Sequence, residues 1–280
     1  MPFHINSELR YKAFERSSLI LNVHALSTAH QSIADESFTV TQGTVCDFFP
    51  CDASQNRSVR VDTCDVSDIQ IHYSATVETT PFICDMFEVE AVSLAQLDLT
   101  VLHYLYPSRY CQSDQMGRIA SKHFGHITHP LGRASAVSDW IFENIDYVSG
   151  TTDTGTSAYD TVTQRAGVCR DFAHLGIALC RALSIPARYF TGYACGMQPP
   201  DFHACFEVCV GNQWYVFDPT RLSAPNGLIQ IATGRDAADS AVASIYGAVQ
   251  LEWMSVSCTA ESFQPIPHEA MAGKALLVEP

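Results

Sequence analysis

Three side chains in the second half of the chain have the types that nucleophilic catalysis requires: Cys169, His203 and Asp218. A cysteine can attack a carbonyl carbon, a histidine can act as its general base, and a carboxylate can orient that histidine. Each residue alone has a simpler explanation, because a free cysteine or a strand histidine is commonly a core residue and an aspartate before proline commonly forms a turn. The three indicate chemistry only if the fold brings them together.

Cys169 lies at the start of a predicted helix that continues to Leu183 and ends before Pro186. Apolar residues recur at helical spacing along it, as expected for a buried helix. They are Val168, Phe172, Leu175, Leu179, Ala182 and Leu183. A thiol at a helix N-terminus lies near unpaired backbone N–H groups and the positive end of the helix dipole, which favour a thiolate and can stabilise an oxyanion. We therefore expect Cys169 to be a nucleophile.

His203 and Asp218 lie on two predicted strands, 203–210 and 213–218, joined by the dipeptide Gly-Asn. This dipeptide is typical of a two-residue hairpin turn. The turn pairs Val210 with Gln213, so His203 and Asp218 become diagonal neighbours on one face, roughly 7 to 8 Å apart at the backbone. The carboxylate of Asp218 can then bond the imidazole of His203, while the other imidazole nitrogen faces Cys169.

The same register gives the hairpin a coherent apolar face on its other side, which supports it because a one-residue slip would reverse both faces. That face carries Ala204, Phe206, Val208, Tyr215 and Phe217. The register also places Cys205 opposite Asp218. Cys205 could fill space in the core or could trap a disulfide with Cys169; in a reducing cytosol we favour the first reading.

Several segments together resemble the bacterial transglutaminase-like superfamily, many of whose members are described as cysteine proteases. They are Gly167-Val168-Cys169-Arg170-Asp171-Phe172-Ala173-His174-Leu175, Ile185-Pro186-Ala187-Arg188-Tyr189, Thr191-Gly192-Tyr193, Asp201-Phe202-His203-Ala204, Phe217-Asp218-Pro219-Thr220 and Gly234-Arg235-Asp236-Ala237-Ala238-Asp239. The resemblance covers about 106–250, and it assigns the thiol, imidazole and carboxylate of the family to Cys169, His203 and Asp218. It implies an α+β fold with a papain-like core, in which the helix bearing the cysteine packs on an antiparallel sheet.

Residues 1–105 read as an all-β domain, because short stretches rich in β-branched and aromatic residues alternate with turn-forming clusters. This segment resembles the amino-terminal domain that such proteins usually carry. Helical periodicity begins near residue 106, with helices predicted at 113–124 and 134–145. We therefore predict a β-rich domain at 1–105 and a transglutaminase-like catalytic domain at 106–280. The alternative is a single fold in which the segment 250–265 pairs back into the β-rich part.

Composition excludes several classes of function. The formal net charge is −14, without a basic cluster, so nucleic acid is not an expected partner. No apolar run approaches the roughly 20 residues of a membrane span, and the first residues do not resemble a signal peptide, so we expect a cytoplasmic protein. Eleven cysteines at scattered spacing, together with His123, His126 and His129 near helix-breaking residues, do not predict a metal site. No cofactor is expected.

The resemblance implies that Cys169 attacks an amide carbonyl to form a thioester, and that His203 passes its proton to the leaving amine. Water as the acceptor gives a protease or amidase acting on a peptide or protein, which we favour; an amine acceptor gives a transglutaminase. A non-catalytic scaffold that retains the fold is the third reading. The identity of the second hydrogen-bond donor to the oxyanion stays open. The side chain of Gln164 could be that donor, but a solvated loop residue is the simpler reading. Sequence leaves the oligomeric state unknown.

Overall fold

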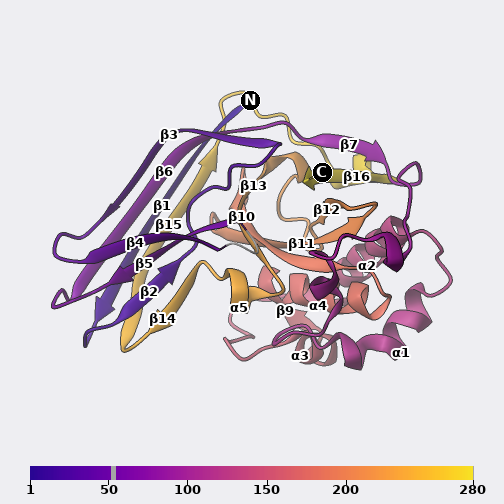
Figure 1. The fold of residues 1–280 in the computed structure, drawn as a ribbon, viewed down its shortest axis with the longest axis horizontal. Helices are drawn as coiled ribbons and strands as arrows, with labels where there is room; N and C mark the ends of the chain where they lie inside the picture. Colours follow the sequence, from indigo (N-terminus) through magenta and orange to yellow (C-terminus); the bar gives the residue numbers. More distant parts are fainter. Residues whose placement is uncertain (52–54, 280) are drawn as a thin grey trace.

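The computed structural model describes residues 1–51 and 55–279, and it shows an α+β protein in two parts. A β-rich part lies on one side, and a sheet covered by helices lies on the other (Figure 1). The predicted fold class is confirmed, including the helix that begins at Cys169 and packs against an antiparallel sheet. Within the described residues, none of the helices combines the length and hydrophobicity that a membrane span requires.

The β-rich part contains two four-stranded antiparallel sheets with the strand orders β15-β1-β6-β3 and β14-β2-β5-β4. Their strands alternate buried and exposed residues, so the apolar faces share one core. The bounds are β1 Pro2–Ala13, β2 Ser18–Leu21, β3 Gln31–Val40, β4 Val45–Cys51, β5 Asn56–Asp62, β6 Asp68–Thr79, β14 Ala243–Tyr246 and β15 Val249–Thr259. Two of the strands thus come from the end of the chain.

The second part is built on a six-stranded antiparallel sheet with the order β13-β10-β11-β12-β16-β7. Its bounds are β7 Phe82–Asp85, β10 Ala187–Ala194, β11 Phe202–Val210, β12 Gln213–Phe217, β13 Leu228–Gly234 and β16 Lys274–Glu279. A small parallel pair, β8 Asp146–Tyr147 and β9 Ala166–Gly167, lies beside the helices. β7 belongs to the first hundred residues, yet it pairs in the sheet of the second part.

In the part of the chain that the structure describes, five α-helices accompany this sheet: α1 Ser113–Phe124, α2 Pro130–Asn144, α3 Ala158–Gln164, α4 Cys169–Ala182 and α5 Ala237–Ser240. Short 3-10 turns occur at Leu94–Gln96, Leu102–Leu105, Pro225–Gly227 and His268–Met271. The predicted helix at 113–124 is confirmed. The helix predicted at 134–145 begins earlier, at Pro130, because proline in the first turn of a helix needs no hydrogen bond for its nitrogen.

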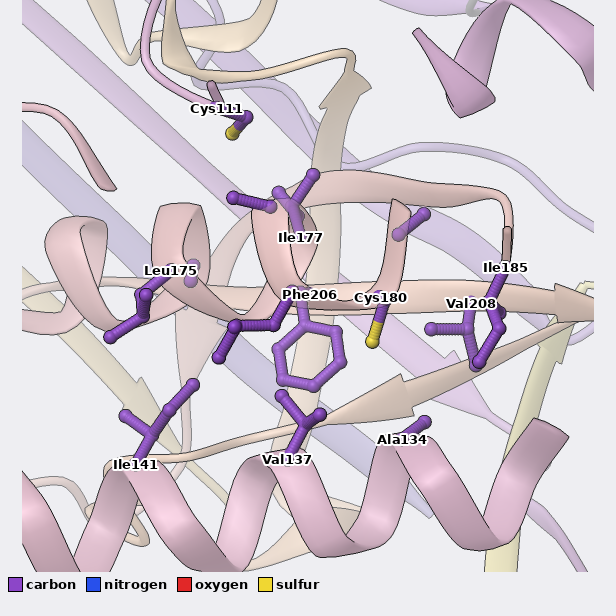
Figure 2. Packing of buried hydrophobic residues seen from close by; sticks show 14 of the residues in the cluster. Cys111, Ala134, Val137, Ile141, Leu175, Ile177, Cys180, Ile185, Phe206 and Val208 are labelled. Atoms are coloured by element: carbon purple, nitrogen blue, oxygen red, sulfur yellow. The ribbon is translucent and has the colours of Figure 1, made fainter. Parts of the chain in front are cut away.

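The core of the second part lies between α4, α2 and the sheet. Figure 2 shows the ring of Phe206, on β11, between α4 and α2, with Val137 and Ile141 on the facing helix. Close approach of α4 to β11 depends on Gly176, since a Cβ there would lie 2.5 Å from the ring of Phe206. Apolar residues of β11 and β12 face this core as the sequence predicted, which confirms the hydrophobic pattern of the hairpin.

Two side-chain amides from the β-rich part join it to β13. The amide of Gln31 accepts from the N–H of Gln230 at 2.8 Å and donates to its carbonyl at 2.8 Å. The amide of Asn56 makes the same reciprocal pair with Thr233, at 2.9 and 2.8 Å. All four residues are buried. The predicted division into folding units at residues 105 and 106 stays a prediction, and strand pairing crosses it in both directions.

Candidate active site

Cys169 is the first residue of α4, and its side chain is partly exposed to solvent. The start of the helix is held by Asp171, whose buried carboxylate accepts from the N–H of Val168 at 3.0 Å and from the hydroxyl of Thr152 at 2.8 Å. A carboxylate in the first turn also complements the helix dipole. Gly167 is required beside it, because a Cβ there would lie 2.8 Å from the Cβ of Asp171. The backbone around the thiol is therefore fixed.

The hairpin that carries the other two residues has the predicted register, with Val210 opposite Gln213 and Phe206 opposite Phe217. Gly211 and Asn212 form the turn, and both have φ of +62°, the left-handed conformation that a two-residue hairpin turn demands. Glycine and asparagine tolerate this conformation better than other residues do. The local sequence therefore sets the alignment of the two strands.

His203 and Asp218 meet as the register predicted: Nε2 of His203 lies 2.8 Å from Oδ2 of Asp218. The other carboxylate oxygen of Asp218 accepts from the backbone N–H of Thr220 at 2.9 Å and from its hydroxyl at 2.7 Å. The side chains of His203 and Asp218 are 0% and 2% exposed. The carboxylate is thus fully engaged and holds the imidazole in one orientation.

The surroundings of this pair favour the charged form of both groups. Burial acts to lower the pKa of His203, but the charge of Asp218 and hydrogen bonding with it raise that pKa well above the ordinary value. Burial acts to raise the pKa of Asp218, but the charge of His203 and the hydrogen bonds from His203 and Thr220 hold that pKa below the ordinary value. The two partners thus stabilise each other's charged form.

Nδ1, the remaining ring nitrogen of His203, is buried and lacks a partner in ordinary hydrogen-bond geometry. The thiol of Cys169 is nevertheless an electrostatic neighbour of the ring and interacts with it as a hydrogen-bonding group. Cys169, His203 and Asp218 are therefore brought together in the order thiol, imidazole and carboxylate. This geometry is suited to proton transfer between the thiol and Nδ1.

Tyr147 is a neighbour of the thiol that sequence reasoning missed. Its strand, β8, pairs with β9 so that Tyr147 lies opposite Gly167, and its ring contacts that of Phe172 with centroids 5.7 Å apart. The hydroxyl interacts with both the backbone N–H and the thiol of Cys169. Burial is the main cause that raises the pKa of Tyr147 to about 12, and the charge of Cys169 adds to it. The hydroxyl thus stays a hydrogen-bond donor at neutral pH. A two-residue strand leaves little signal in sequence.

Cys205 packs on the face of the sheet opposite the helix, in a small buried cluster with Phe190, Val216 and Leu276. Its sulfur and the ligand atoms of His203 and Asp218 lie within 4.8 Å of one another, and they form the one group of potential metal ligands found in residues 1–51 and 55–279. Burial raises the pKa of the Cys205 thiol to about 12, which disfavours the thiolate that a metal would need. We therefore interpret Cys205 as a core residue of this cluster.

The other candidates are not brought to the site. His129 bonds the carbonyl of Val89 at 3.0 Å, and the ring of His123 packs against that of Trp140. Gln164 is exposed at the end of α3. These observations place the three side chains in ordinary structural surroundings.

Two family models match the chain. The model of the transglutaminase-like superfamily matches residues 118–219, which include Cys169, His203 and Asp218, and the model of the bacterial transglutaminase N-terminal domain matches residues 1–100. Among curated proteins, an uncharacterized protein of Mycobacterium leprae is 28% identical over 187 residues, which cover 62% of this chain and 66% of that protein. One of Mycobacterium tuberculosis is 33% identical over 114 residues, covering 35% of this chain and 36% of that protein.

Among solved structures, "a Putative Cysteine Protease from Cytophaga hutchinsonii" superimposes with a TM-score of 0.94. It is 48% identical in sequence, and the match covers 99% of this chain and 97% of that one. The likeness extends over both parts of the fold, and the two family models match in the same order along the chain. The chain therefore belongs to the transglutaminase-like superfamily, with a bacterial transglutaminase N-terminal domain preceding the core.

Proposed function

We propose that this protein is a cysteine-nucleophile acyl-transfer enzyme that hydrolyses a peptide or other amide bond through a thioester. The observation that carries the proposal is the buried contact of 2.8 Å between Nε2 of His203 and Oδ2 of Asp218, on an imidazole that also interacts with the thiol of Cys169. A carboxylate so engaged fixes both the tautomer and the direction of the imidazole. The likeness to the solved "Putative Cysteine Protease from Cytophaga hutchinsonii" supports the same chemistry.

In the first step, the sulfur of Cys169 attacks the amide carbonyl carbon, and its proton resides on Nδ1 of His203. Collapse of the tetrahedral intermediate breaks the C–N bond, and the same proton passes to the leaving amine. Water then attacks the thioester, His203 takes the proton of that water, and the carboxylic acid and the thiol are released. Asp218 balances the charge of the imidazolium during each transfer.

Two donors beside Cys169 are suited to stabilising the oxyanion of each intermediate. One is the backbone N–H of Cys169 at the start of α4, and the other is the hydroxyl of Tyr147, whose oxygen accepts from that N–H until substrate displaces the contact. Donors that are fixed before the reaction stabilise developing negative charge at little reorganisation cost. Tyr147→Phe should lower turnover by about 10-fold to 10³-fold with a smaller change in KM. Tyr159→Phe, at an exposed tyrosine, is the matched control.

Water and amines compete for the thioester, so the partition between them distinguishes an amidase from a transglutaminase. A peptide, isopeptide and glutamine-donor panel should be assayed with and without a fluorescent primary amine. We expect carboxylic acid to dominate over amine adduct. Predominant adduct formation would instead favour transamidation, and inactivity over the whole panel with an unreactive Cys169 would favour a scaffold.

The decisive pair of variants is Cys169→Ala and Cys205→Ala. The first removes the proposed nucleophile and should reduce turnover to the background rate, while the second removes a packed thiol beside the same histidine and should leave measurable turnover. Equal activity of Cys169→Ala and the wild type would disprove the proposal. We also propose that the protein is cytoplasmic, where its thiols would stay reduced, and that its substrate is a peptide or protein. Cell fractionation tests the location.

A further inference from the structure

The turn that follows β12 encloses the carboxylate of Asp218, and we call its residues 218–223 the carboxylate turn. Oδ1 of Asp218 accepts from the backbone N–H of Thr220 at 2.9 Å and from the hydroxyl of the same residue at 2.7 Å. Oδ2, which contacts His203, also accepts from the backbone N–H of Ser223 at 3.4 Å. Asp218, Thr220 and Ser223 are all buried. The turn therefore supplies donors to both oxygens of the carboxylate.

A second contact determines the direction of the Thr220 hydroxyl. The backbone N–H of Leu222 donates to Oγ1 of Thr220 at 3.1 Å, so this oxygen acts as an acceptor toward the turn itself. A hydroxyl has a single proton to donate, and that proton points to Oδ1 of Asp218. The carboxylate can then rotate about its Cβ–Cγ bond only by breaking both contacts that Thr220 makes with Oδ1. Oδ2 thereby stays directed at His203.

The carboxylate turn is also fixed from outside. Arg221 has φ of +56°, a left-handed conformation that is uncommon for a residue with a large side chain. Its guanidinium pairs with Asp139 at 2.6 Å and lies over the ring of Phe142, 4.0 Å from the centroid; both partners belong to α2. The carbonyl of Ser223 accepts from Nε2 of His268 at 2.7 Å. The turn thus keeps an unfavourable backbone shape because neighbouring elements hold it on both sides.

We propose that Thr220 is a positioning residue of this active site, whose hydroxyl holds the carboxylate of Asp218 in the orientation in which Oδ2 meets Nε2 of His203. The inference rests on the proposed function, because it concerns the pair that orients the imidazole toward Cys169. Without the hydroxyl, Oδ1 retains the backbone N–H of Thr220, and the carboxylate gains freedom to turn away from His203. Thr220 thus acts on the reaction through Asp218.

The charge of the carboxylate is served by the same contacts. Burial acts to raise the pKa of Asp218, but the charge of His203 and the hydrogen bonds from His203 and Thr220 hold that pKa below its ordinary value. A donor to a buried carboxylate stabilises the ionised form. Loss of the Thr220 hydroxyl therefore weakens both the orientation and the charge on which His203 depends.

Two pairs of variants isolate the hydroxyl. Thr220→Val keeps the branched shape of the wild-type side chain, whereas Thr220→Ala and Thr220→Ser both lack the methyl group and differ from each other by the hydroxyl alone. On the best substrate of the panel, kcat should fall about 10-fold to 100-fold from wild type to Thr220→Val, and by a similar factor from Thr220→Ser to Thr220→Ala, because a hydrogen bond to a charged group is lost. KM should change by less than about 3-fold, since Thr220 acts through Asp218.

Thr63→Val is the matched control. Thr63 is a buried threonine of the β-rich part, and its hydroxyl oxygen accepts from the backbone N–H of Ser17 at 2.9 Å. Both valine variants remove a buried hydrogen bond and should lower the Tm, but kcat should fall in Thr220→Val and not in Thr63→Val. In an Asp218→Ala background, Thr220→Val should change the rate of Cys169 alkylation by less than about 2-fold, because no carboxylate is left to position.

Alkylation by iodoacetamide near neutral pH, followed by peptide mapping, separates this inference from the proposed function. If wild-type Cys169 reacts no faster than the partly exposed Cys64, the proposed function fails and the inference fails with it. If Cys169 reacts faster, yet Thr220→Val turns over like the wild type and Thr220→Ala like Thr220→Ser, the proposed function stands and the inference is overturned. Loss of folding in every variant without the hydroxyl would assign Thr220 to stability, which also overturns the inference.

Discussion

The hairpin β11–β12 and the β-rich part are both antiparallel sheet, yet their paired strands differ in how far apart they lie in the sequence. β11 and β12 are joined by two residues whose left-handed backbone sets the register. β1 instead pairs with β6 and with β15, which lies near the other end of the chain (Figure 1). The active-site alignment is therefore encoded locally, while the β-rich part and its junction depend on contacts between distant segments. The two regions should respond differently to substitution.

The largest effect is expected at the locally encoded site. Asp218→Asn keeps the size of the side chain but removes the charge that orients and balances His203, so turnover should fall by about 10²-fold to 10⁴-fold. The fold should survive, as circular dichroism would show. A folded variant with undiminished turnover would leave at best a dyad of Cys169 and His203.

The same variant tests the charged state of the pair through pH. The raised pKa of His203 contributes stability that is complete below about pH 6.5 and is lost as pH rises through the folded-state pKa. The lowered pKa of Asp218 contributes stability that is complete above about pH 3.9 and is lost as pH falls through its folded-state pKa. The difference in unfolding free energy between wild type and Asp218→Asn should therefore be largest between these two pH values. Urea titrations across pH measure it, and a flat difference would contradict the ion pair.

A smaller effect is expected at the junction, where the contacts are distant in sequence. Asn56→Ala should destabilise the protein by about 1 to 3 kcal/mol, because it leaves the buried N–H and C=O of Thr233 unpaired. The exposed Gln115→Ala should change stability by less than about 0.5 kcal/mol. Turnover of folded Asn56→Ala should be close to that of the wild type.

Limited proteolysis of Asn56→Ala would sharpen the comparison further. If the segment 1–105 is a separate folding unit, as the sequence predicts, cleavage near its end should release a stable fragment more readily from the variant. Loss of both fragments would mean that β15 and β7 make the two parts interdependent, since each pairs across the predicted boundary.

The last comparison concerns two glycines in helices, and it includes the smallest expected effect. Gly176→Ala should destabilise the protein by about 1 to 3 kcal/mol, because the added Cβ would lie 2.5 Å from Phe206. Gly117→Ala has no atom within 4 Å of the new Cβ and should stabilise α1 by about 0.5 to 1 kcal/mol. Thermal unfolding checks both signs. A neutral Gly176→Ala would show that α4 can move away from β11 without cost.

Sequence predicted those features whose cause is local. The turn at Gly211-Asn212 gave the register, the apolar stripe gave α4, and together they gave the contact between His203 and Asp218. Tyr147 was missed because its two-residue strand is specified by its partner, β9. The pairing of 250–265 with the β-rich part was an alternative that the sequence left open, and the pairing of β14 was not predicted, because alternation indicates a strand but does not identify the strand beside it.

The amides at the junction also lie along an edge of the six-stranded sheet. β13 is an outer strand of the six-stranded sheet, and the edge of a sheet can recruit a strand from another molecule. Gln31 and Asn56 occupy the outward N–H and C=O groups of Gln230 and Thr233 with side chains that imitate a neighbouring peptide. A strand from another molecule could therefore not pair with β13 at these two residues without displacing the amides.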